Sequence, residues 1–204
     1  MQIMKAADHR RMPWKNGKGE TAEIALFPED AGLEDFGWRL SMASVSEPGA
    51  FSIFPGIDRV LAIVQGEGLR LLVEGREAIV TPEREAAAFA GDVDVTSDLL
   101  GGPVVDLNLM TRRGRFHGSM ERVGGQERRE IAGKGAATLV VLRAPCAVSS
   151  RDGSVPLARL DVVRVEDGEV LSFQPALAAL DLLVVRIVEN GEEAGKVLQS
   201  FTNS

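Results

Sequence analysis

Short hydrophobic runs, separated by glycine and proline, fill most of this chain. Between residues 21 and 110 they read TAEIALF, WRLSMASV, RVLAIVQ, LRLLVEG, EAIVT, AAAFA, DVTSDLL and VVDLNLM. The runs are rich in Val, Leu and Ile and end at turn pairs such as EG, GD and GG, a pattern typical of β-sandwiches and barrels. Long helical periodicity is absent, and only residues 29–36 and the stretch EREAAA favour a helical turn. The pattern predicts an all-β protein.

The pattern changes after residue 116. Residues 117–135, HGSMERVGGQERREIAGKG, are polar and glycine-rich, which favours a connection. Strand-like runs then resume as ATLVVLRAP, SVPLARLDVVRV, EVLSFQP and LDLLVVRIVE. We therefore expect residues 1–116 to form an N-terminal half that carries the functional site, and residues 117–204 a C-terminal β-barrel half. The halves should pack as one compact unit, with strands open to exchange between them.

Alternation along residues 104–112 separates polar from apolar side chains, because successive residues of a strand point to opposite sides. One face carries Val105, Leu107 and Leu109. The other face carries Asp106, Asn108, Met110 and Arg112. The polar face points either to solvent or to the interior of a barrel, and Met110 favours the interior because a methionine gains nothing from a wet surface.

The run WRLSMASV divides in the same way. Trp38, Leu40 and Met42 alternate with Arg39, Ser41 and Ala43. Arg39 and Ser41 could line a cavity together. Alternatively, Arg39 caps a sheet edge or pairs with a carboxylate at the surface. Trp38 is a candidate apolar wall.

Asp58 and Arg59 follow a Pro-Gly turn and precede a strand. They form either an ion pair that stabilises the turn or part of a ligand-binding mouth, since small barrels open where strands begin.

The stretch PWKNGKGET, residues 13–21, places an indole, ammonium groups and a carboxamide in a loop broken by glycines. Glycine gives such a loop backbone angles that other residues avoid. We expect Trp14, Lys15, Asn16 and Gly17 to form the lip of a cavity, or Trp14 to plug the end of a core. Lys18 either adds a cation to an anion site or points outward.

Composition narrows the class of protein. The 204 residues suffice for a substantial core, and a net charge of -7 with a pI near 5.0 argues against nucleic-acid binding. No apolar run approaches the roughly 18 residues of a membrane span, and the N-terminus lacks the apolar core of a signal peptide. A single cysteine, Cys146, predicts a buried inert thiol in a reducing compartment. We expect a soluble cytoplasmic protein.

The sequence lacks the residues that several kinds of functional site require. The two histidines, His9 and His117, have no partner at metal-ligand spacing, and we expect both in solvated loops. GxSxG and GxxxxGK[ST] are absent, so a serine nucleophile and a phosphate loop are not expected. We expect no metal and no cofactor. The Lys, Arg, Asp, Asn and Trp residues that remain suit a small organic acid.

Five stretches then carry a family resemblance. PWKNGKGET-AEIA, FGWRLSMASV, GAFSIFPGIDRVLAIVQGEG, FAGDVDV and GGPVVDLNLMTRRGR resemble, in this order, the HutD/Ves family. The resemblance covers roughly residues 10–116. The rest of the chain resembles the family only in its general sequence pattern. The family's first loop usually reads NGGG, whereas Lys18 replaces a glycine here.

The resemblance implies a cupin-like double β-barrel, a bicupin, without the usual histidine ligands for a metal, and an association with bacterial histidine utilisation. Our leading hypothesis is a protein that modulates histidine catabolism by binding an anionic metabolite such as formylglutamate or urocanate. Lys15, Arg39 and Arg59 would contact its carboxylate. Asn16, Asp106 and Asn108 would orient amide or imidazole groups.

Two alternatives stay open. One is a metal-free isomerase or hydrolase that uses Asp58, Asp106 or Lys15 as its acid-base group. The other is a protein-interaction module whose motifs only stabilise the barrels. Exposed β edges also leave a homodimer open.

Overall fold

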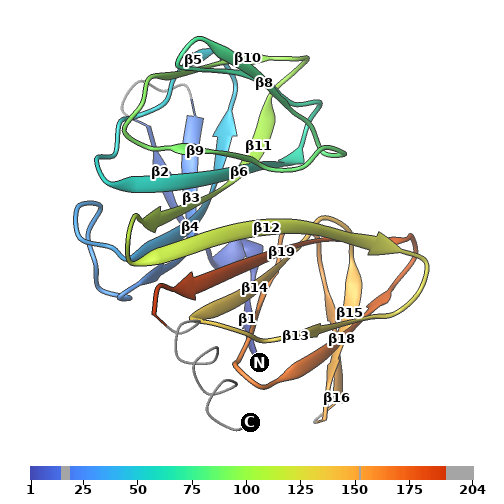
Figure 1. The fold of residues 1–204 in the computed structure, drawn as a ribbon. Helices are drawn as coiled ribbons and strands as arrows, with labels where there is room; N and C mark the ends of the chain where they lie inside the picture. Colours follow the sequence, from blue (N-terminus) through green and yellow to red (C-terminus); the bar gives the residue numbers. More distant parts are fainter. Residues whose placement is uncertain (15–18, 152, 192–204) are drawn as a thin grey trace, which may run out of the picture.

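Four β-sheets stack face to face, two in each half of the molecule (Figure 1). The computed structural model describes residues 1–14, 19–151 and 153–191. In the first half, the six-stranded sheet consists, in order, of β2 (Arg10–Pro13), β3 (Gly19–Phe27), β4 (Trp38–Val45), β11 (Val104–Arg112), β6 (Ile57–Gln65) and β9 (Ala87–Ala90). A four-stranded sheet faces it, in the order β5 (Gly49–Ala50), β10 (Val95–Leu99), β7 (Leu69–Val73) and β8 (Arg76–Val80).

The second half repeats this plan. Its five-stranded sheet consists of β1 (Gln2–Met4), β17 (Val162–Val165), β14 (Ala137–Leu142), β19 (Leu180–Glu189) and β12 (Phe116–Gly125). Its four-stranded sheet consists of β13 (Arg129–Ala132), β18 (Val170–Pro175), β15 (Cys146–Ser150) and β16 (Gly153–Leu157). The first strand of the chain, β1, thus lies in the sheet of the second half, and the short 3-10 helix η1 (Ala6–Asp8) leads from it to β2.

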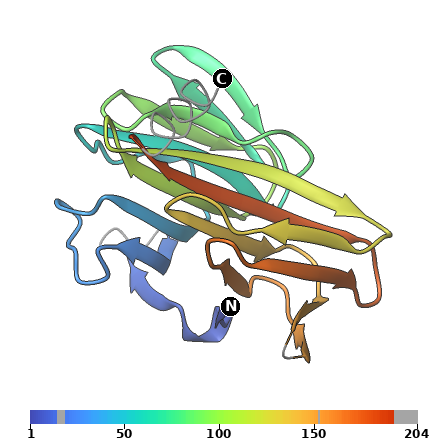
Figure 2. The same ribbon diagram turned by 60° about the horizontal axis from the view of Figure 1, so that its bottom comes forward.

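The two large sheets pack back to back at the centre of the molecule, an arrangement that Figure 2 shows from a second side. Leu40, Met42, Leu107 and Leu109 from the first half meet apolar side chains of β14, β17 and β19 in one buried cluster. Because side chains alternate along a strand, this contact leaves the polar residues of β4 and β11 on the opposite face, inside the first half.

Each half also encloses an interior of its own. Leu61, Ile63, Leu69 and Leu71 fill much of the first, whereas the second contains a larger apolar cluster from all of its sheets. Cys146 belongs to the second cluster, and burial raises the pKa of its thiol to about 11. The prediction that Cys146 is buried is therefore confirmed, and its raised pKa agrees with a thiol of low reactivity.

The structure confirms the all-β prediction and changes three details. Residues 116–125 form strand β12, not a connection, and pair along their length with β19. Residues 29–36 form turns and an irregular segment, not a helical turn. His9 is buried, although we expected a solvated histidine, because the N-terminal segment packs into the seam between the halves.

Shortening a side chain in the central contact tests this architecture. Leu109 is fully buried between the large sheets, so Leu109→Ala should lower the free energy of unfolding by about 2–5 kcal/mol. Leu177 is fully exposed, and Leu177→Ala should change the free energy of unfolding by less than about 0.5 kcal/mol. Urea denaturation compares the two, and equal effects would contradict the central packing.

Candidate functional site

Three neighbouring strands of the six-stranded sheet bring the predicted polar residues together. Arg39 on β4, Met110 on β11 and Arg59 on β6 lie side by side across the strands. Ser41 and Asn108 form the next row along the strands, and Asp106 the row after that, opposite Ala43. All of these side chains lie on the inner face, because their neighbours in sequence pack against the second half.

Arg39 is held by a carboxylate. Only 6% of its surface is exposed, and its Nε donates a hydrogen bond to Glu23 Oε2 at 2.7 Å. Its Nη1 donates to Ser41 Oγ at 3.3 Å. A bulge in β3 between Glu23 and Ala25 shifts the register beside β4. Arg39 therefore has a fixed position, with its charge compensated inside the protein.

Arg59 is held mainly by aromatic rings. Its guanidinium lies 4.7 Å from the centre of the Phe51 ring and 5.3 Å from that of Phe89. Its Nε is 3.4 Å from Asn108 Oδ1, a long hydrogen bond. Burial lowers the pKa of Arg59 to about 10, against the opposing effect of Asp106, and the charge of Arg39 lowers it further. This cation has weak compensation and is suited to bind an anion.

Asp106 is the most deeply buried acid in this group. It is 1% exposed, and its Oδ1 has no hydrogen-bond partner among the described residues. Burial raises the pKa of Asp106 to about 7, although Arg59 acts in the opposite direction. A carboxyl group with this pKa can accept or give a proton near neutral pH. Its unpartnered oxygen could accept a hydrogen bond from an N–H or O–H group of a ligand.

Trp14 closes one side of the same interior. Its indole Nε1 donates to Thr21 Oγ1 at 2.8 Å, and its ring packs against the core of the first half. The backbone approaches closely here: a Cβ on Gly19 would collide with the Ser44 carbonyl and lie 3.0 Å from the indole. Lys15, Asn16, Gly17 and Lys18 lie outside the described residues.

Two of the candidate residues lie on the other side of the sheet. Trp38 stacks on Phe27, with ring centres 6.2 Å apart, in the contact between the halves. Asp58 Oδ1 accepts a hydrogen bond from Arg113 Nε at 2.7 Å in an exposed ion pair. Asp58 and Arg59 are adjacent in sequence, and strand alternation therefore separates them across the sheet. Met110 shares the inner face but packs mainly against Phe36 and Ile57.

The structure adds three residues that the sequence analysis missed. Glu23 alternates with Thr21 along TAEIALF, and this alternation was a usable sign that both face inward. Phe51 and Phe89 gave no such sign, because each reaches Arg59 from a different part of the chain.

The donor set does not suit the metal that cupins commonly hold. Two guanidinium groups, from Arg39 and Arg59, project into this interior, and neither can ligate a cation. No cluster of three or more His, Cys, Asp or Glu side chains suited to a metal occurs in the part of the chain that the structure describes. The described side chains therefore do not fit that metal.

Two cavities, of about 370 and 220 Å³, lie at the seam between the halves. Neither cavity coincides with the polar group around Arg59. Glu23 lines the larger cavity and also accepts the hydrogen bond from Arg39 in the polar group. We place the candidate site at the polar group because its buried charges are incompletely compensated there.

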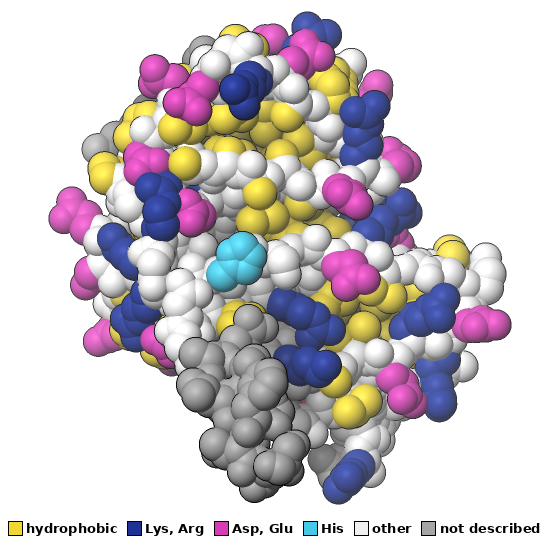
Figure 3. Space-filling view, viewed as in Figure 1, with side chains coloured by type: hydrophobic (Ala, Val, Ile, Leu, Met, Phe, Trp, Pro, Cys, Tyr) yellow, Lys and Arg dark blue, Asp and Glu magenta, His cyan; other side chains and the backbone are white. Residues whose placement is uncertain are grey.

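On the face of the molecule shown in Figure 3, acidic and basic side chains are interspersed, and no large area carries charge of a single sign. Such mixing does not favour a polyanion on that face. Among the described residues, no helix has the length and apolar character to cross a membrane.

Comparison with known proteins places this arrangement in a family. The family profile described as HutD matches residues 6–181, which is most of the chain. The chain belongs to the HutD family. A relative in Pseudomonas putida, described as an uncharacterized 21.2 kDa protein in the hutC 3' region, is 41% identical over 63% of this chain and 67% of its own. Protein Ves of Citrobacter koseri is 38% identical over 68% of this chain and 73% of its own.

Solved structures agree with the HutD assignment. HutD from Pseudomonas fluorescens SBW25 is 32% identical and covers 93% of this chain and 99% of its own, with a TM-score of 0.76. A conserved protein of unknown function from Pseudomonas aeruginosa PAO1 is 34% identical and covers 92% of this chain and 98% of its own, with a TM-score of 0.80. A cupin 2 conserved barrel domain protein from Leptotrichia buccalis shares the fold, with a TM-score of 0.57. It is 8% identical and covers 89% of this chain and 98% of its own. The predicted cupin-like fold is confirmed.

The buried carboxyl of Asp106 gives the fold a defined pH dependence. Burial raises the pKa of Asp106 from 3.8 to about 7, so the folded protein holds this proton more tightly than the unfolded chain. The resulting stabilisation is fully present below about pH 4 and is lost as the pH rises to about 7. Relative to wild type, Asp106→Asn should therefore gain up to about 4 kcal/mol of stability over this range. Urea denaturation at several pH values measures the gain, and a difference that does not vary with pH would contradict it.

Proposed function

We propose that this HutD-family protein binds a small anionic metabolite inside its first half and thereby modulates histidine catabolism in the cytoplasm. The observation that carries the proposal is the buried, weakly compensated guanidinium of Arg59 beside the unpartnered Oδ1 of Asp106. Buried charged groups normally have hydrogen-bond partners, whereas Asp106 Oδ1 has none among the described residues.

The charge count supports an anion as the ligand. Arg39 and Glu23 neutralise one another at 2.7 Å. When Asp106 carries a proton, the charge of Arg59 has no buried counterpart in this group. A buried charge without compensation is unfavourable, and a ligand carboxylate on Arg59 would supply the compensation.

The ligand should also donate a hydrogen bond. Asp106 Oδ1 is the free acceptor, so an N–H group near the carboxylate would complete the site. Formylglutamate has an amide N–H and urocanate an imidazole N–H, and both carry carboxylates. This shared chemistry, together with the name of the Pseudomonas putida relative, supports an intermediate of histidine breakdown.

The second half provides an internal comparison. Val140, Val163, Val184 and Phe173 belong to its hydrophobic core, and on the same inner face the buried Thr138 accepts a hydrogen bond from Arg186 Nη1 at 3.5 Å. Among its described residues no buried arginine lies beside a buried aspartate, so the same architecture folds without such a group, which supports a ligand-binding role for the group in the first half. Solvent-facing Arg39, Asp106 and Asn108 would have favoured the alternative of a protein-interaction module, and all three are buried.

Removing the Arg59 charge tests the anion site. Calorimetric titration of wild-type protein with formylglutamate, urocanate and glutamate should give a binding heat for at least one. Arg59→Gln should weaken that binding by about tenfold or more, because a hydrogen bond to a charged group is lost. Arg70 is an exposed arginine on β7, and Arg70→Gln is the matched control with unchanged affinity. Absence of heat for all three acids would refute the proposal.

Binding should also take up a proton near neutral pH. Arg59 lowers the pKa of Asp106, so an anion that neutralises Arg59 should raise this pKa above its value of about 7. Affinity should then fall as the pH rises beyond 7, by at most about tenfold per pH unit. Calorimetry in two buffers with different ionisation heats counts the protons. Asp106→Asn should abolish the uptake, and binding of wild type without proton exchange would contradict the assignment.

A further inference from the structure

The N-terminal segment bridges the two halves. Its strand β1 pairs with β17 of the second half, and β2 pairs with β3 of the first. Between them, the buried carboxylate of Asp161 accepts hydrogen bonds from Lys5 Nζ at 2.9 Å and from the Ala6 backbone at 3.0 Å. These contacts anchor η1 to the second half and fix the position of the residues that follow it.

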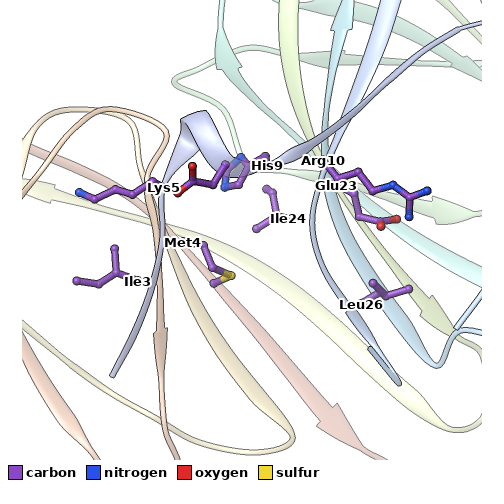
Figure 4. A pocket seen from close by; sticks show the side chains of 9 residues that line it. Ile3, Met4, Lys5, His9, Arg10, Glu23, Ile24 and Leu26 are labelled. Carbon is purple, nitrogen blue, oxygen red and sulfur yellow. The ribbon is translucent and has the colours of Figure 1, made fainter. Parts of the chain in front are cut away.

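A cavity of about 370 Å³ lies between this segment and β3. We call it the seam cavity. Figure 4 shows Ile3 and Met4 on one side, Ile24 and Leu26 on the other, and His9 above them. The volume falls within the lower range of small-molecule sites. Two apolar walls therefore face each other with His9 between them, and the charged side chains of Lys5, Asp8, Arg10 and Glu23 complete the lining.

The charged groups of the seam cavity are already compensated. Lys5 pairs with Asp161 at 2.9 Å, and Glu23 pairs with Arg39 at 2.7 Å. The remaining two, Asp8 and Arg10, are exposed and of opposite sign. A charged molecule would find no uncompensated buried counterpart here, so the cavity favours an uncharged one.

His9 supplies the free polar atom. The side chain is 8% exposed, and its Nε2 has no hydrogen-bond partner among the described residues. A hydrogen bond to the backbone of Met4 holds the ring. Burial, and then the charge of Arg11, lowers the pKa of His9, which favours the neutral ring. With Nδ1 carrying the proton toward Met4, Nε2 has a lone pair and acts only as an acceptor.

We propose that the seam cavity is a second binding site, which takes an uncharged, mainly apolar molecule that donates one hydrogen bond to His9 Nε2. The apolar walls would contact the body of the molecule, and the donor would satisfy an acceptor that is otherwise buried without a partner. His9 lies between the seam cavity and the 220 Å³ cavity, and because its Nε2 is buried in the structure, its ring would turn toward the donor on binding.

Phenol and toluene test the site, because they match in size and differ in the hydroxyl donor. The chain has only His9 and His117, so nitrogen NMR of histidine-labelled full-length protein resolves both rings. Phenol should shift the His9 Nε2 signal saturably and leave His117 unchanged. Toluene should bind about fivefold more weakly and leave the Nε2 signal in place. Equal binding of the two, or no shift with phenol, would overturn the proposal.

Two variants separate the site from general surface binding. His9→Phe should weaken phenol about fivefold by removing the acceptor, while His117→Phe, at an exposed position, should have no effect. Ile24→Trp should fill the cavity, and the His9 Nε2 signal should then no longer respond to phenol. A phenol response in folded Ile24→Trp equal to that of wild type would also overturn the proposal.

Discussion

The back-to-back packing of the two large sheets determines where the polar residues of this protein lie. Leu40, Met42, Leu107 and Leu109 cover the second half. Since strands alternate strictly, residues at the intervening positions must enter the first half. Arg39, Asp106 and Asn108 therefore reach a closed interior as a consequence of the same contact that joins the halves.

That enclosure explains the unusual electrostatics of the interior. Arg39 has Glu23, whereas Arg59 has the faces of Phe51 and Phe89 and only a long hydrogen bond to Asn108. Aromatic faces attract a cation but do not neutralise it. The pKa of Asp106 is raised to about 7 for the same reason, because burial outweighs the nearby Arg59. In the mainly hydrophobic interior of the second half, Arg186 donates hydrogen bonds to the Ala132 carbonyl and to Thr138.

Much of this arrangement could be predicted from local sequence patterns. Alternation identified the strands β4 and β11 and grouped Arg39 and Ser41, as well as Asp106 and Asn108, on faces that proved to be shared. It could not identify Phe51 and Phe89, whose contacts with Arg59 depend on tertiary packing. His9 was also beyond local reasoning, because its burial depends on β1 joining the sheet of the other half. Polar β12 was misread because many of its side chains are exposed on the sheet.

A crystal structure of the protein soaked with formylglutamate or urocanate tests the central claim most directly. The account predicts the carboxylate of the bound molecule within hydrogen-bond distance of Arg59, and its N–H group on Asp106 Oδ1. A first-half interior that stays unchanged at saturating concentration, with the molecule absent or bound only elsewhere, would contradict it. In that case the arginine and aspartate group would be a structural feature of the fold.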